Sequence, residues 1–459
     1  MRKLSVVFIA LVVLGALLYQ YAAKFMRGNA EDQTATGSNN QTVMSADAEA
    51  QPVEITIWDS TTKDEFIVRE RAEFLKLHPN IRINAVVHEG DGGADFYQGV
   101  AAGNAPDLVV LNQALMDKYV RAGIIAPLDR YFASWGESKY FIKKWLDYFM
   151  YNGQLYGLPG ESSTIFFGYN KRLFREAGIA APPQTWAEML EDAKKLTIPA
   201  KQQYGYNILA SEWCEWWFQY YVWQAGGDLT KQNPDGTLKL TFTDPAVVKA
   251  AEFYQQLMKA HVTQTDLSMK FDALLQAFAK GKAAMMPFAS DWVAWAVSLG
   301  ADINDIGLAP FPKGPGGTGM TGGGPGCWAI NAKTTKEKQD AAWAYISFVS
   351  SKGYITEEQQ NLAEINGAAN PVIIPRTDFT IGNIVKIDPD LLHVLKVVEL
   401  ETRPEFYGKG VVGKYVDHAV QRIVSDPNVK PFEEFKRAQE QAEKEVLSDF
   451  NKDILSESN

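Results

Sequence analysis

Apolar and polar positions follow a regular succession of strand and helix patterns from residue 53 onward. Residues 53–58 alternate apolar and polar side chains, as a half-buried strand does. The patterns then predict a helix at 64–77, a strand at 81–87, a helix at 94–102, a strand at 107–111 and a helix that ends at Arg121 before Gly123. Strands that alternate with helices at this spacing predict a mainly parallel α/β sheet.

A second set of elements begins after the turn-rich stretch 151–159, which has the pattern of a hairpin and which we interpret as a crossing between two lobes. Thr185 and Glu188 form a capping box that predicts a helix start. Strand-like stretches lie at 165–169, 204–209 and 283–288, and helices are predicted at 171–177, 246–259, 271–280, 341–350 and 432–455. No short-period repeat is visible, which disfavours a solenoid or propeller.

The N-terminal stretch has the pattern of an export signal. Arg2 and Lys3 precede an apolar run from Leu4 to Leu18, so residues 1–25 are predicted to be a signal peptide or an N-terminal membrane anchor. No cysteine follows the run, which excludes a lipid anchor on this segment. Residues 26–52 are polar and poor in large apolar side chains, as a flexible tether is. Both interpretations place the folded body outside the cytoplasm, either tethered or secreted.

Composition excludes several classes of function. The 459 residues carry 45 Lys and Arg against 55 Asp and Glu, a net charge of −10 that argues against a nucleic-acid partner. Cys214 and Cys327 form no CxxC pair, so with five histidines we expect no zinc site, and no metal or cofactor at all. The glycine-rich strings at 314–319 and 408–414 match nucleotide-binding motifs only as text, because the first contains a proline and the second has Tyr415 where Ser or Thr should hold magnesium.

Tryptophans beside carboxylates are the most informative feature. Residues 211–223 hold four tryptophans; a helix packed into the core explains Trp217, Tyr220, Tyr221 and Val222. Trp213 and Trp216 stand beside Glu212 and Glu215, and sugars bind by stacking on aromatic faces and donating hydroxyl hydrogen bonds to carboxylates. Asp291 and Trp292 repeat this pairing, although Asp291 is also placed to cap a helix. Carboxylates such as Glu212 and Asp291 would also suit a glycosidase.

The ends of the first strands predict one rim of a ligand site. Ligands bind at the carboxyl ends of strands in open α/β sheets, which here points to 59–61, 88–91 and 112–113. The glycine cluster 322–326 before Trp328 indicates a close backbone approach to a ligand, with a mobile surface loop as the alternative.

From residue 53 to the end, the chain resembles extracellular solute-binding proteins of the carbohydrate-uptake class, the family that includes maltose-binding protein. The motifs that carry the resemblance include IxIW at 55–58, HPNIxIN at 78–84, GNAPDLVVL at 103–111, YNGQLYGLP at 151–159, FFGYNKRLFREAGI at 166–179, FAKGKAAMM at 278–286 and IGLAPFPKG at 306–314.

The resemblance implies a type II periplasmic-binding-protein-like α/β fold whose two lobes close over one ligand. Each lobe would hold a mainly parallel sheet flanked by helices, with lobe 1 at 53–150 and 306–350 and lobe 2 at 151–305 and 351–459. The hinge would lie at 149–153, near Ile306 and near Ser350. The protein would act without catalysis, as a monomer, and deliver a carbohydrate to the membrane permease of an ABC importer.

Ligand-binding residues are expected from both lobes and the hinge: Asp59, Ser60, Thr61, Asp91, Asn112, Gln113, Ser162, Ser163, Trp213, Glu215, Trp216, Asp291, Trp292, Gly323, Gly324 and Trp328. The four tryptophans would stack on sugar rings, and the carboxylates would accept hydroxyl hydrogen bonds. The chain departs from maltose-binding protein at Asn112 and near Ser163, so the resemblance does not imply a maltose-type pocket.

Two alternatives stay open. A secreted glycosidase shares the tryptophan and carboxylate signature, and the same fold could bind a non-sugar solute such as a glycerol phosphate, polyol or peptide. A phosphate ligand would require arginine in the cleft; the predicted rim has none, although Arg376 could reach it.

Overall fold

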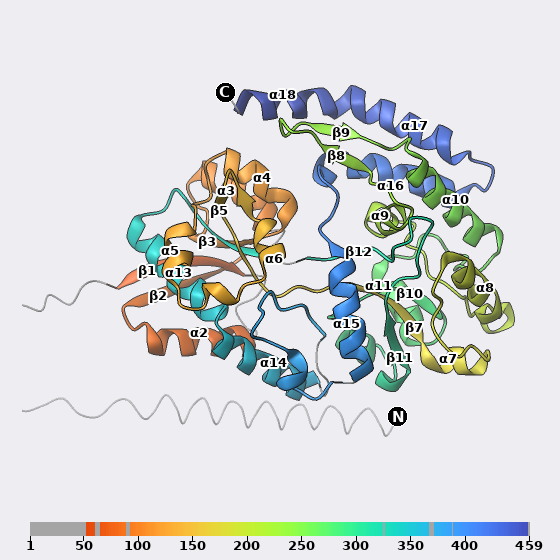
Figure 1. The fold of residues 1–459 in the computed structure, drawn as a ribbon, viewed down its shortest axis with the longest axis horizontal. Coiled ribbons are helices and arrows are strands. Elements are labelled where there is room, and N and C mark those ends of the chain that lie inside the picture. The colour runs from red at the N-terminus through yellow and green to blue at the C-terminus, as the bar shows by residue number, and fades with distance from the viewer. Residues whose placement is uncertain are drawn as a thin grey trace, which may run out of the picture. The chain divides into compact units, whose positions relative to one another are not determined.

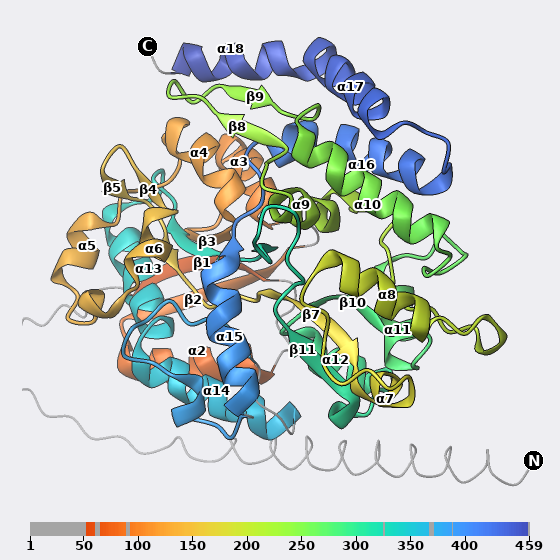
Figure 2. The same cartoon turned by 45° about the vertical axis from the view of Figure 1, so that its right-hand side comes forward.

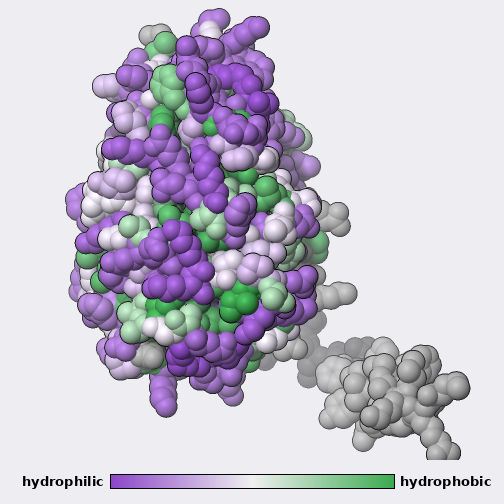
Figure 3. Space-filling model, turned by 90° about the vertical axis from the view of Figure 1, so that its right-hand side faces the viewer, coloured by the Kyte–Doolittle hydropathy of each residue, from purple (hydrophilic) through white to green (hydrophobic). Residues whose placement is uncertain are grey.

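The computed structural model describes residues 52–59, 65–88, 92–324, 326–366, 371–387 and 389–457. The predicted signal or anchor and nearly all of the predicted tether lie outside these ranges. Within them, every helix is too short or too polar to span a bilayer. The face shown in Figure 3 is mostly hydrophilic, with hydrophobic groups scattered between the polar ones.

The first sheet is mixed: its three N-terminal strands pair in parallel, as predicted, and its later strand does not. Its strand order is β2-β1-β3-β13-β6, of which β2, β1 and β3 are labelled in Figure 1. The strands are β1 (Val53–Asp59), β2 (Ile81–Val87), β3 (Leu108–Leu111), β6 (Leu158–Pro159) and β13 (Cys327–Ile330). β1 pairs in parallel with β2 and β3, whereas β13 is antiparallel to both β3 and β6. The sheet therefore combines the N-terminal elements with one strand from much later in the chain.

The second sheet has three strands in the order β10-β7-β11. They are β7 (Ile165–Asn170), β10 (Met285–Ala289) and β11 (Ile306–Ala309). Both neighbours are antiparallel to β7, so the expectation of a mainly parallel sheet is wrong here. The chain enters this part of the fold along β7 and leaves it along β11 before it rejoins the first sheet at β13. Because β7 leads away from the first sheet and β11 leads back toward it, these neighbouring strands run in opposite directions.

Helices and short strands complete the described elements. The helices are α2 (Glu65–Leu77), α3 (Gly92–Ala102), α4 (Gln113–Arg121), α5 (Asp129–Ser134), α6 (Lys143–Asp147), α7 (Lys171–Glu176), α8 (Trp186–Leu196), α9 (Cys214–Gln224), α10 (Pro245–Lys259), α11 (Phe271–Ala279), α12 (Trp292–Ser298), α13 (Lys336–Val349), α14 (Lys352–Asn366), α15 (Pro389–Glu401), α16 (Lys409–Ser425), α17 (Pro431–Ala442) and α18 (Ser448–Glu457). The short strands are β4 (Met150–Tyr151), β5 (Gln154–Leu155), β8 (Thr230–Gln232), β9 (Leu238–Leu240), β12 (Thr321–Gly322) and β14 (Thr402–Arg403).

Local sequence explains most of these boundaries. The Thr185 side chain accepts a hydrogen bond from the backbone N–H of Glu188, and Pro245 occupies the first turn of α10, where its missing N–H costs nothing. The predicted strand at 204–209 makes only isolated bridges. The predicted C-terminal helix is continuous, with a π-helical turn at Glu443–Leu447 between α17 and α18.

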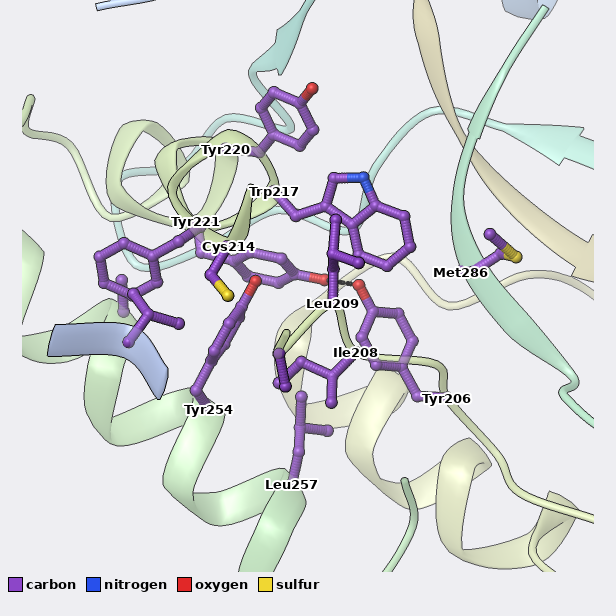
Figure 4. Close-up of a cluster of buried hydrophobic side chains, with 14 of the residues drawn as sticks. Tyr206, Ile208, Leu209, Cys214, Trp217, Tyr220, Tyr221, Tyr254, Leu257 and Met286 are labelled. Carbon is purple, nitrogen blue, oxygen red and sulfur yellow. Dashed lines mark hydrogen bonds between the residues drawn. The ribbon is translucent and has the colours of Figure 1, made fainter. Parts of the chain in front are cut away.

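The second sheet and its helices enclose the largest core. α9 packs against α10 and α16, as Figure 2 also shows. Trp217, Tyr220 and Tyr221 are fully buried on α9, which confirms their predicted core role. In Figure 4 the hydroxyls of Tyr206 and Tyr221 meet at 2.5 Å within this cluster. Such a bond satisfies both groups away from water.

Three segments lie side by side and are here called the crossing segments: 160–164, which runs from β6 to β7, 321–324, which lies between β11 and β13, and 402–405, which follows α15 and pairs with the second segment. β12 pairs with β14, and Thr164 forms a bridge with Gly323. The Thr164 and Thr402 hydroxyls are 2.7 Å apart. The crossing segments are therefore fastened to one another by buried hydrogen bonds.

The crossings differ from those expected from sequence. Residues 149–153 lie within the β4–β5 hairpin region, and Leu155 belongs to the core of the first sheet. β11, which begins at Ile306, pairs in the second sheet, and Ser350 caps α13, which α14 then contacts. A hairpin pattern in the sequence predicts that the chain reverses direction, but it does not predict which of the two cores the hairpin packs against.

Candidate functional site: a cleft at the crossing segments

A cavity of about 430 Å³ lies where the crossing segments meet the two halves. Its lining combines polar, glycine and aromatic residues: Asn112, Gln113, Tyr148, Ser163, Ile165, Trp216, Ala289, Asp291, Trp292, Gly323, Gly324, Gly326, Pro404 and Glu405. Eight of the predicted ligand-binding residues are therefore brought together: Asn112, Gln113, Ser163, Trp216, Asp291, Trp292, Gly323 and Gly324. A volume of this size is typical of small-molecule sites.

The first sheet contributes amide side chains. Asn112 directly follows β3, and its side-chain oxygen accepts a hydrogen bond of 3.2 Å from the backbone N–H of Leu115. Asn112 thereby caps α4, which begins at Gln113. The position at a strand end and helix start explains why the sequence rule for α/β sheets located both residues.

The second half contributes two tryptophans. The rings of Trp216 and Trp292 lie 6.0 Å apart at an interplanar angle of 66°. Trp292 is 9% exposed and is held by Phe271, whose ring centroid is 4.5 Å away, and by Phe288 at 5.8 Å. These buried aromatic contacts leave little freedom to the Trp292 ring, which also borders the cavity.

Asp291 contributes an exposed carboxylate. It occupies the N-cap position of α12, but its side chain makes no capping hydrogen bond. The alternative role as a side-chain cap is therefore not fulfilled, and the carboxylate borders the cavity instead.

The glycines of the second crossing segment bring the backbone to the cavity wall. Gly323 and Gly324 have φ angles of +147° and +119°, where side chains are disfavoured. A Cβ on Gly323 would lie 2.9 Å from the carbonyl oxygen of Ser163. Ser162 does not line the cavity; its hydroxyl donates to the Ser163 carbonyl and accepts from the Gly324 N–H, so it fastens two crossing segments.

Glu405 and Tyr148 line the cavity without having been predicted. Glu405 forms an ion pair with Lys409, whose ammonium also lies 3.6 Å from the carboxylate of Glu215. Glu215 is 7% exposed and stands behind the wall rather than on it. Burial raises its pKa to about 7, and the nearby Asp417 adds to the shift while Lys409 opposes it.

Other predicted residues lie elsewhere. Trp213 is 55% exposed and does not line the cavity. Trp328 borders a separate cavity of about 190 Å³, with its ring edge-on to Tyr345. Ser60, Thr61 and Asp91 lie outside the described residues, and so does the side chain of Asp59.

The geometry does not assemble the carboxylate pair considered for hydrolysis. Glu212 accepts a hydrogen bond from the Phe271 N–H and lies 3.6 Å from Lys270, outside the cavity lining. Cys214 and Cys327 are free and buried, and burial raises the pKa of both thiols. Among the described residues, no three potential ligands gather to hold a metal ion.

A cavity between two sheet-centred halves, at the point where the crossing segments lie side by side, defines a two-lobed ligand-binding protein. Residues 58–355 match the model of the bacterial extracellular solute-binding protein family, and the chain belongs to that family.

Known relatives agree with this assignment. A putative binding protein of Brucella abortus is 28% identical over 69% of this chain and 76% of its own length. The maltotriose-binding protein of Pyrococcus abyssi is 23% identical over 81% of this chain and 74% of its own length. A tagatose-bound solute-binding protein of Thermotoga lettingae has a similar fold, with a TM-score of 0.70 and 21% identity over 85% of this chain and 99% of that one.

Proposed function

We propose that the protein captures a neutral carbohydrate in the cleft, closes its two lobes over it, and delivers it to the permease of an ABC importer. The proposal extends the family assignment, and the maltotriose-binding relative supports a carbohydrate as ligand. In this proposal the protein acts by binding and release, as a monomer. A segment within residues 1–52 tethers it to the membrane or directs its secretion.

The inclined pair Trp216 and Trp292 beside the carboxylate of Asp291 carries the proposal. A sugar ring presents apolar C–H groups on its faces and hydroxyls at its edge. The apolar C–H groups pack against an indole face. The hydroxyls donate hydrogen bonds to a carboxylate, and such bonds are stronger than those to a neutral acceptor. The amides of Asn112 and Gln113, which the first half contributes to the lining, provide donors and acceptors for further hydroxyls.

A phosphate-bearing solute is the second candidate, because glycerol-3-phosphate-binding proteins are among the relatives, one of them from Agrobacterium fabrum at 25% identity. The cavity favours the carbohydrate. Its described lining residues include Asp291 and Glu405 but no Lys, Arg or His. Arg376, which sequence allowed as a phosphate contact, has a fully buried side chain paired with Glu137 at 2.8 Å and Asp378 at 3.0 Å.

The test is a thermal-shift screen of the full chain against neutral mono- and oligosaccharides, polyols, glycerol 3-phosphate and short peptides. A ligand at 100 times its Kd stabilises the folded state by about 2.7 kcal/mol. We expect a shift with neutral sugars that Trp216→Ala and Asp291→Asn both diminish. A shift with glycerol 3-phosphate alone would overturn the carbohydrate assignment, and consumption of an oligosaccharide would overturn the non-catalytic role.

A further inference from the structure

Each cavity tryptophan has a second, exposed tryptophan three positions away. On α9, Trp216 lines the cavity and Trp213 precedes it at the helix start; on α12, Trp292 lines the cavity and Trp295 follows it. On α12 this spacing places Trp292 and Trp295 on one helix face, whereas Trp213 lies at the N-cap of α9, just outside the helix. Trp213 is 55% exposed and Trp295 is 39% exposed, so both present aromatic surface to water.

Phe271 links the inner and outer rings. Its ring centroid lies 4.5 Å from that of Trp292 and 5.7 Å from that of Trp295. The backbone N–H of Phe271 donates to Glu212, the residue directly before Trp213, over 3.1 Å. Phe271, at the start of α11, therefore contacts both tryptophans of α12 and is bonded to the residue next to Trp213, and ring-to-ring contacts continue from the cavity to Trp295.

The backbone at Trp213 is held in an unfavourable conformation. Its φ of +46° lies in the left-handed region, which bulky side chains rarely adopt. Trp213 occupies the N-cap position of α9 without making a side-chain capping bond. Asn would fit both the conformation and the cap, so Trp here is unfavourable for stability in two respects. A strained, exposed indole three residues before a cavity tryptophan points to a role in binding rather than in folding.

Polar groups border this aromatic surface as they border the cavity. Glu212 and Lys270 lie 3.6 Å apart next to Trp213 and Phe271. Their carboxylate and ammonium supply an acceptor and a donor beside the two exposed rings. The combination of indole faces with charged edges thus repeats the chemistry of the inner site.

We propose that Trp213 and Trp295 form an outer subsite for the additional rings of an oligosaccharide whose end occupies the cavity. The inference rests on the proposed function and specifies it: the preferred ligand has three or more rings. The inner pair, Trp216 and Trp292, holds the end that enters the cavity, and the outer pair extends the stacking surface beyond its mouth.

Isothermal titration calorimetry tests the proposal with malto-, cello- and xylo-oligosaccharides of one to four rings. For wild type we expect one series to gain at least tenfold in affinity between two and three or four rings. Trp213→Ala and Trp295→Ala should lose that gain and keep the wild-type affinity for the shortest sugar that binds. Trp216→Ala should weaken binding at every length. Val297→Ala, which removes another exposed side chain of α12, is the control and should change nothing.

A second variant separates binding from folding. Trp213→Asn should raise the thermal midpoint of the sugar-free protein and still lower the affinity for the three-ring sugar, a pair of opposite effects that a purely structural tryptophan would not give. Outer variants that keep wild-type affinity at all lengths, while Trp216→Ala loses it, would overturn the outer subsite but not the proposed function. A wild-type protein that binds no member of any series would overturn both.

Discussion

Replacing Gly322 by Ala tests whether the crossing segments hold the cavity wall in place. Gly322 ends β12, which pairs with Arg403 of β14, and it immediately precedes the cavity residues Gly323 and Gly324. An added Cβ would lie 2.3 Å from Cε1 of Tyr220 and 2.9 Å from its hydroxyl oxygen. Ordinary van der Waals contact begins at 3.4 Å, so the ring and the strand must separate by about 1 Å.

Tyr220 cannot absorb this displacement cheaply. It is fully buried, and its ring contacts Trp223 and Phe311 at centroid distances of 5.8 and 5.9 Å. Overpacking of such a site costs about 1–3 kcal/mol. At about 1 °C per kcal/mol for a chain of this size, the thermal midpoint should fall by about 1–3 °C. Because the strand leads directly into the cavity wall, we also expect about a tenfold loss of sugar affinity.

Differential scanning calorimetry and titration with the sugar found by the screen measure both effects. Gly353→Ala is the matched control: a Cβ there meets no atom within 4 Å, and its helical position should make the change neutral or stabilising by up to about 1 kcal/mol. Adding Tyr220→Leu to Gly322→Ala should restore part of the affinity by making room. If Gly322→Ala melts and binds like wild type, the argument that a buried ring fixes the wall is refuted.

Three further predictions concern burial and charge. Tyr221→Phe should destabilise the protein by about 1–3 kcal/mol, since it leaves the buried Tyr206 hydroxyl without its partner. Tyr220→Phe removes a buried hydroxyl that has no hydrogen-bond partner among the described residues and should be neutral or stabilising; urea denaturation compares the two, and equal losses would contradict the reasoning. Burial, with the charge of Glu70 adding to it, raises the pKa of Glu358 from 4.5 to about 7. Between these two pKa values the folded state binds more protons than the unfolded chain, so stability should fall as the pH rises from about 4.5 to about 7. Glu358→Gln should flatten the curve of thermal midpoint against pH, and an unchanged slope would count against a proton bound to Glu358 in the folded state. Asp291→Asn should weaken sugar binding about tenfold without changing the midpoint of the sugar-free protein, because the carboxylate caps nothing; calorimetric titration would contradict this by showing wild-type affinity.

Local patterns were sufficient for the first half of the fold. The strand and helix periods at β1, α2, β2 and α4 depend on neighbouring residues, so they can be recognised without knowledge of the tertiary structure. The direction of β10 and β11 against β7 depends instead on how the chain enters and leaves the second sheet. No periodicity within a strand encodes that choice.

The same distinction separates the site residues that were predicted from those that were missed. Asn112 and Gln113 follow a recognisable strand, and Trp216 and Trp292 stand out by residue type beside a carboxylate. Glu405 follows no distinctive pattern and reaches the cavity because the third crossing segment carries it there. Glu215 stands beside a tryptophan in the sequence, as the predicted sugar-binding carboxylates do. In the fold its side chain is buried and lies near Lys409, away from the cavity lining.

The distribution of the lining residues links binding to closure. Asn112 and Gln113 belong to the half built on the first sheet, whereas Trp216 and Trp292 belong to the half built on the second. A sugar stacked on the tryptophans can also bond to the amides only when the halves are together, so these additional bonds favour the closed form alone. A ligand shifts a conformational equilibrium only by its better contacts with one state, and a shift from 1:99 to 99:1 requires about 5.5 kcal/mol. At about 1 kcal/mol for each hydrogen bond between neutral groups, several bonds across the cleft are needed. Stacking on the second half alone should therefore retain a sugar without closing the cleft, and the amides of the first half should decide which bound sugars close it.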